Sequence, residues 1–150
     1  MKRRDMLAAA GTGLAMLALA RPAFATTEEM AAAINTFTAG VKPTEGKVTF
    51  DIAQLIDNGN AVPATISVDS AMTAADHVSA IAIFNERNPQ TDVAVFTLGP
   101  RAGKAQVSTR IRLATSQKLT AVARMGDGSY RSKSVSVIVA LAACIEGEAP

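Results

Sequence analysis

The stretch KLTAVARMGDGSYRSKSVSVIVAL, residues 118–141, decides the fold. Its first half alternates apolar and polar residues, and the apolar ones share a face: Leu119, Ala121, Ala123 and Met125. The turn formers Gly126-Asp127-Gly128 follow. Its second half also has an inward set with a period of two: Val135, Val137, Val139 and Leu141. The stretch therefore predicts a β-hairpin that buries one face of each strand.

The same short-strand pattern extends upstream through five more segments: residues 47–52, 62–68, 78–84, 93–98 and 107–113. The segment 78–84 is almost continuously apolar, as in a strand covered on both faces. Seven short strands separated by turn residues are typical of an immunoglobulin-like antiparallel β-sandwich, so we expect an all-β fold of this kind. A closed barrel with a similar number of strands is the alternative.

One short helix is expected before the strands, at residues 26–38. Its apolar residues fall on one stripe at helical spacing: Met30, Ala33, Ile34 and Phe37. Thr27 is the expected cap at the start of this helix, and Gly40 is a residue type that commonly follows a helix end.

Residues 1–25 have the features of an export signal. Basic residues at the start precede an apolar run at 7–20, which is shorter than the roughly 20 residues that span a bilayer. The Arg3-Arg4 pair indicates the twin-arginine route, and an ordinary secretory signal is the alternative. Ala23-Phe24-Ala25 provides the small residues that signal peptidase accepts, so the mature protein should begin at Thr26. Either route predicts a periplasmic protein.

The charge of the mature chain argues against two classes of partner. Residues 1–25 hold four of the 15 basic residues and one of the 13 acidic residues, which leaves a net charge of about −1. Nucleic acids and anionic membranes both select dense positive charge, so we expect neither as a partner.

The residue types of a catalytic or metal site are scarce. His77 is the one histidine, whereas a zinc site needs three or four ligands and a blue-copper site needs two histidines with a cysteine. Asp51 and Asp57 are more typical of solvated residues than of an acid–base pair. We therefore expect no metal, no cofactor and no enzymatic activity of the chain's own.

Cys144 is the single cysteine, so an internal disulfide is impossible. It follows the last predicted strand, in the tail 142–150, whereas a structural cysteine is more typically found inside a strand. A reactive thiol on a C-terminal arm is the first interpretation. A small residue packed against the end of the sandwich and an intermolecular disulfide are the alternatives.

Several segments resemble the SoxY family, which carries sulfur in periplasmic thiosulfate oxidation. They are KPTEGKVTFD at 42–51, IDNGNAVP at 56–63, VDSAMT at 68–73, FNERNP at 84–89, VSTRIRLA at 107–114 and MGDGS at 125–129. The resemblance covers about residues 26–144 and implies an immunoglobulin-like domain at 26–141 with a carrier arm at 142–150. It also implies a heterodimer with a second sandwich subunit, SoxZ.

In that family a cytochrome partner conjugates thiosulfate to a cysteine on the arm, and a hydrolase then releases sulfate. By position, this carrier role falls on Cys144. The family arm ends in Gly-Gly-Cys-Gly-Gly, whereas here the flanking residues are Ala142, Ala143, Ile145 and Glu146. The added side chains restrict the backbone, and nearby carboxylates should raise the pKa of the thiol. The alternative is a divergent binding or structural module that carries no sulfur.

Overall fold

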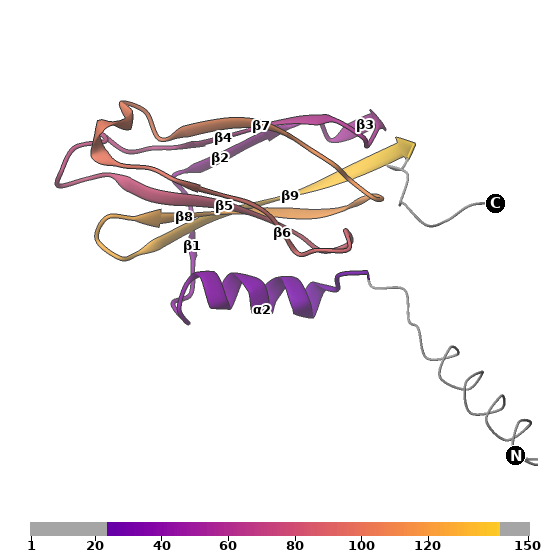
Figure 1. The fold of residues 1–150 in the computed structure, drawn as a ribbon, viewed down its shortest axis with the longest axis horizontal. Coiled ribbons are helices and arrows are strands. Elements are labelled where there is room, and N and C mark those ends of the chain that lie inside the picture. The colour runs from indigo at the N-terminus through magenta and orange to yellow at the C-terminus, as the bar shows by residue number, and fades with distance from the viewer. Residues whose placement is uncertain (1–23, 142–150) are drawn as a thin grey trace, which may run out of the picture.

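The computed structural model describes residues 24–141, which form two stacked β-sheets with one helix against the outside of the larger sheet (Figure 1). The larger sheet runs in the order β1-β9-β8-β5-β6, and β3 pairs with β9. Its strands are β1 (Thr44–Glu45), β9 (Tyr130–Leu141), β8 (Gln117–Met125), β5 (Val78–Asn85), β6 (Asp92–Thr97) and β3 (Leu55–Asn58). The smaller sheet has the order β2-β4-β7. Its strands are β2 (Val48–Ile52), β4 (Val62–Val68) and β7 (Gln106–Ile111).

The seven predicted strands are all present, and they form a sandwich of two separate sheets rather than a closed barrel. The inward residues of both sheets meet in one core, and its largest fully buried members are aliphatic: Ile66, Ile81, Ile83, Leu113, Leu119 and Val78. Burying an aliphatic side chain of this size stabilises the fold by ~1.5–3 kcal/mol, so this layer holds the two sheets together.

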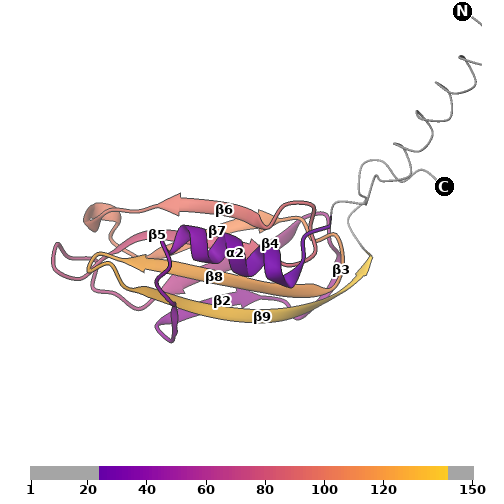
Figure 2. The ribbon, with the colours of Figure 1, turned by 90° about the horizontal axis from the view of Figure 1, so that it is seen from below.

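Helix α2 (Thr27–Phe37) covers the outer face of the larger sheet; it lies below the sheet in Figure 1 and in front of it in Figure 2. The predicted stripe is confirmed, because Met30 and Phe37 pack with Phe84 and Tyr130 in a second apolar cluster. The rings of Phe37 and Phe84 meet edge to face, with centroids 5.8 Å apart. Val122 of β8 is also fully buried in this cluster, although alternation alone would turn it toward solvent.

The prediction of Thr27 as the helix cap is wrong by one residue. Thr26 is the N-cap: its Oγ1 accepts from the Glu29 N–H at 3.2 Å, and its own N–H donates to the Glu29 carboxylate at 2.9 Å. This reciprocal capping box needs a glutamate three residues after the cap, and Glu29 satisfies that spacing from Thr26.

Two short strands were not predicted, and both run parallel to β9. β1 pairs with the start of β9, and β3 pairs with its end, where Leu55 lies opposite Ile138 and Asn58 opposite Leu141. The prediction that Leu141 points into the core is also wrong, since its side chain is 66% exposed. The pairing of β8 with β9 stops at Gln117–Val137, so Leu141 lies beyond the part of β9 that packs over the core.

No helix within residues 24–141 is long and apolar enough to cross a membrane.

Candidate functional site

The site residues predicted from the sequence are Cys144 and its neighbours Ala142, Ala143, Ile145 and Glu146, and all five lie outside the described residues. The structure does describe the residue from which this segment continues, because β9 ends at Leu141. The end of β9, Ile138 to Leu141, is therefore the base of the predicted arm, and we refer to it as the arm base.

Hydrogen bonds fix the end of β9 to the body of the domain. The Ile138 N–H donates to the Gln54 carbonyl at 2.8 Å, and the Val139 N–H donates to Ser116 Oγ at 2.9 Å. The Leu141 carbonyl accepts from the Gly59 N–H at 2.9 Å. The N–H groups of Ile138 and Val139 and the carbonyl of Leu141 are thus all paired with residues of the loops next to β3 and β8. The arm begins at a defined point on the surface.

Gly59 connects the arm base to the loop after β7. Its N–H reaches Leu141, and its carbonyl accepts from the Leu113 N–H at 2.9 Å. The turn around Gly59 is closed by Asn58, whose Oδ1 accepts from the Asn60 N–H at 2.9 Å. The Asn58-Gly59-Asn60 turn therefore links the end of β9 to the loop after β7.

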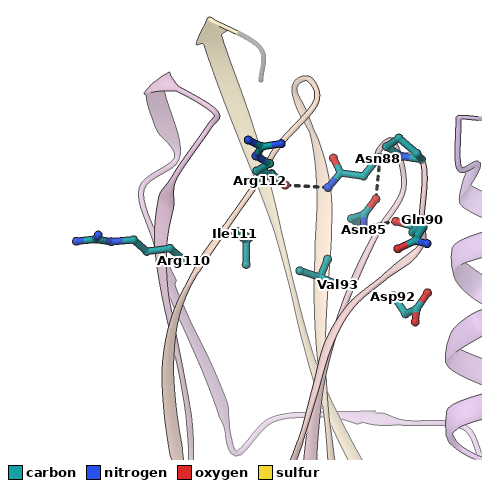
Figure 3. A pocket seen from close by; sticks show the side chains of 9 residues that line it. Asn85, Asn88, Gln90, Asp92, Val93, Arg110, Ile111 and Arg112 are labelled. Carbon is teal, nitrogen blue, oxygen red and sulfur yellow. Dashed lines mark hydrogen bonds between the residues drawn. The ribbon is translucent and has the colours of Figure 1, made fainter. Parts of the chain in front are cut away.

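A hollow of about 450 Å³ opens next to that loop, between the end of β5, β6 and β7. Figure 3 shows Asn85, Asn88 and Gln90 on one side of it, and Arg110, Ile111 and Arg112 on the other. Amide side chains line one side of the hollow, Val93 and Ile111 lie between its two sides, and the Arg110 side chain extends away from it (Figure 3).

Asn88 holds the two sides of the hollow together. Its Nδ2 donates to the Arg112 carbonyl at 2.8 Å. Its Oδ1 accepts from the Ala114 N–H and from Gln117 Nε2, each at 2.9 Å. Its backbone N–H donates to Asn85 Oδ1 at 2.8 Å. These hydrogen bonds therefore hold the loop after β7 in a fixed position next to the end of β9.

The other residues singled out in the sequence lie elsewhere. Asp51 on β2 and Asp57 on β3 are exposed. His77 packs across the backbone of Gly126 at the opposite end of β9, where it lines a cavity of about 70 Å³. Asp127 lines the same cavity, and hydrogen bonds from Ser129 lower its pKa below the ordinary value. Within residues 24–141, no three His, Cys, Asp or Glu side chains gather as a metal site would require.

The family is decided by comparison with known sequences, since a family model described as sulfur oxidation protein SoxY matches residues 34–144. The chain belongs to the SoxY family. The matched residues include all nine strands of the described part of the chain and extend through Cys144. A comparison with curated protein sequences gave no match.

Solved structures agree with this assignment. The sulfur carrier protein SoxY from Chlorobium limicola f thiosulfatophilum is 25% identical in sequence, with a TM-score of 0.64, over 76% of this chain and 98% of the Chlorobium chain. A superoxide reductase (neelaredoxin) from Ignicoccus hospitalis has a TM-score of 0.56 at 13% identity, over 77% of this chain and 94% of its own. A superoxide reductase from Nanoarchaeum equitans has a TM-score of 0.53 at 13% identity, over 65% and 99%. The two reductases share the fold alone.

Sequence reasoning missed the residues that hold the arm base, above all Leu55 and Gly59. The available signal was the apolar pair Leu55-Ile56 just before the Asn58-Gly59-Asn60 turn. Four residues are too few to establish a period of two, and their partner strand lies some 80 residues later in the chain.

Proposed function

We propose that this SoxY family member is a periplasmic sulfur carrier, which holds thiosulfate-derived sulfur on Cys144 and presents it to enzymes of sulfur oxidation. The observation that carries the proposal is the family match, because it continues past the last strand and includes Cys144. The anchoring of Leu141 supports it, since a carrier arm needs a fixed base from which to present its cargo.

The chemistry resides in the partners, and the chain supplies the sulfur atom that is modified. In the loading step the Cys144 thiol and thiosulfate form a new S–S bond. One proton leaves the thiol and two electrons pass to a cytochrome partner. In the release step a hydrolase adds water across the terminal S–S bond, which frees sulfate and leaves one sulfur on Cys144 as a persulfide. The chain is therefore a covalent platform rather than an enzyme.

The residues around Cys144 should make loading slower than on a glycine-flanked arm. Ala142, Ala143 and Ile145 avoid the left-handed backbone conformations open to glycine, which reduces the ways the arm can enter a narrow site. The carboxylates of Glu146 and Glu148 disfavour both the thiolate and an incoming anion. Salt screens part of this charge effect, because the Debye length is ~10 Å at 0.1 M.

The carrier is expected to work with a second subunit. Family membership implies a SoxZ-like sandwich protein, and the described part of the chain offers exposed sheet edges that such a subunit could cover. We expect a heterodimer that buries roughly 1,200–2,000 Å² in total. Purification from the native host should yield a second small protein in equal amount, and a monomer at native concentration would contradict this expectation.

The proposed location rests on residues 1–25. N-terminal sequencing of the exported protein should give Thr26 as the first residue. Replacing Arg3 and Arg4 with lysine should block export through the twin-arginine route. Normal export of that variant would leave the ordinary secretory route, and an intact Met1 on cytoplasmic protein would exclude export.

Three proteins test the carrier role: the native chain, Cys144→Ser, and a variant in which residues 142–150 are replaced by Gly-Gly-Cys-Gly-Gly. Each is incubated with thiosulfate and the thiosulfate-conjugating cytochrome of the same host, and adducts are measured by intact mass spectrometry. We expect an adduct on the native chain, none on Cys144→Ser, and faster loading of the glycine variant. A thiol that reacts with iodoacetamide only after unfolding would make Cys144 structural. A reactive thiol that is never loaded on either arm would favour the alternative, a binding module without sulfur cargo.

A further inference from the structure

The outer face of β9 changes character just before the arm. Side chains on this face are spaced two apart, and up to the end of the pairing with β8 they are serines: Ser132, Ser134 and Ser136. The next two outward positions are apolar: Ile138 and Ala140. Ile138 is 59% exposed, so burial in the core does not account for this change.

A second strand adds to this apolar surface. Leu55 of β3 lies directly opposite Ile138 in the parallel pairing, and partners in register share a face of the sheet. Leu55 is 72% exposed, the highest exposure among the large apolar residues of the described chain. Leu141, the last residue of β9, is 66% exposed, but its odd spacing from Ile138 places it on the opposite face of the strand. We refer to Leu55, Ile138 and Ala140 as the arm-base patch.

The short distance from Leu141 to Cys144 determines what must approach this patch. Cys144 is three residues beyond Leu141, and an extended chain spans at most ~3.3–3.6 Å per residue, so the two Cα atoms are within about 11 Å of each other. Because the Leu141 carbonyl is held by Gly59, this distance is measured from a fixed point. An enzyme that encloses the Cys144 sulfur must therefore bring its own surface close to the end of β9.

A protein–protein interface of ordinary size, centred at the end of β9, includes the arm-base patch. A standard protein interface covers roughly 800 Å² on each partner, which corresponds to a disc about 16 Å in radius. Ile138 lies three residues before Leu141, roughly 10 Å back along the strand. A contact centred at the arm base therefore reaches Ile138 and its neighbour Leu55, and exposed apolar groups at such a place are typical of interaction surfaces.

We propose that the arm-base patch is the docking surface for the enzyme that loads Cys144, and that this enzyme surrounds the entrance to its active site with apolar side chains. This inference rests on the proposed carrier function. The patch supplies affinity beside the arm, so the enzyme recognises the folded domain as well as the tail.

The test compares the double variant Leu55→Ser/Ile138→Ser with a matched control, Val95→Ser. Val95 is 56% exposed, similar to Ile138, but it lies on β6 at the other edge of the larger sheet. All proteins are used as purified with the subunit that accompanies them. The rate of adduct formation on Cys144, with thiosulfate and the cytochrome, is measured against carrier concentration. Alkylation of Cys144 by iodoacetamide is measured in parallel.

We expect the double variant to raise the KM for the carrier roughly tenfold, as truncation of an interface anchor commonly does, with little change in kcat. Alkylation should be unchanged, and Val95→Ser should behave as the native chain. An unchanged KM would overturn the docking proposal, and so would slower alkylation, which would mean that the variant alters access to the thiol. A changed subunit composition would show that the patch is a subunit interface instead. If the native chain itself is not loaded, the carrier function fails, and the docking proposal fails with it.

Discussion

Asn85 offers a direct test of how the hollow beside the arm base is held, because its side chain is fully buried at the end of β5. Its Nδ2 donates to the carbonyls of Gln90 at 2.7 Å and Thr91 at 3.3 Å. Its Oδ1 accepts from the Asn88 N–H at 2.8 Å. Asn85→Ala removes these bonds at a place where water has little access. We expect the free energy of unfolding to fall by ~2–4 kcal/mol, since each buried group left unpaired costs ~1–3 kcal/mol.

The assay is thermal unfolding followed by circular dichroism, with denaturant titration to give the free energy. For a domain of about this size, such a loss lowers Tm by roughly 10 °C. Gln90→Ala is the control, because the Gln90 side chain is exposed and only its main-chain carbonyl accepts the hydrogen bond from Asn85. The free energy of unfolding of this variant should stay within about 0.5 kcal/mol of the native value. A loss below ~1 kcal/mol for Asn85→Ala would refute the reasoning, because water would then be replacing the amide.

Asn85→Asp tests the same bonds through pH. The substituted carboxyl keeps an acceptor for the Asn88 N–H but turns its other oxygen toward the carbonyls of Gln90 and Thr91. Burial and these carbonyls raise its pKa in the folded state above the ordinary value of about 3.9. A group with a raised folded pKa stabilises the fold below its unfolded pKa, and this stability is lost as pH rises through the folded pKa. Relative to native protein, the variant should therefore become more stable as pH falls from 7 toward about 4, and parallel pH profiles would contradict the argument.

Three further predictions concern stability away from the arm. Gly126→Ala should cost ~1–3 kcal/mol by overpacking, since the new Cβ would lie 2.7 Å from His77 Nδ1, and denaturant titration should show a much smaller cost in a His77→Ala background. Hydrogen bonds from Ser129 are the main reason that the pKa of Asp127 is lowered in the folded state. The ionised Asp127 side chain therefore stabilises the fold at pH values above its unfolded pKa, and this stabilisation is lost as pH falls below about 4. In a plot of stability against pH, Asp127→Asn should accordingly show a smaller loss of stability at acid pH than the native chain. Thr26→Ala should cost ~1 kcal/mol through loss of the capping box, and an unchanged Tm would mean that α2 is held by its packing alone.

The sequence predicted the elements whose signals are local. Alternation of apolar and polar residues located most of the seven main strands, because a strand with one buried face has a period of two in its sequence, and a nearly continuous apolar run located β5. The stripe containing Met30 and Phe37 predicted the helix in the same way. The segment 78–84 was predicted to be covered on both faces, and β5 is, with its inner face in the core and Phe84 against α2. The position of Cys144 beyond the last strand also came from the sequence, and its role stays a prediction.

The tertiary structure decided what depends on partners distant in the sequence. Leu55 meets Ile138, and Gly59 meets Leu141, across some 80 residues, and no local pattern specifies such a pairing. The sequence also did not predict that Leu141 is exposed. Alternation indicates the direction in which a side chain points, but not where the opposing sheet ends. Local backbone preferences thus determine which segments are strands. Pairing and burial are set by contacts that form only when the whole chain has folded, and these contacts place the arm base and its apolar patch together at one end of the sandwich.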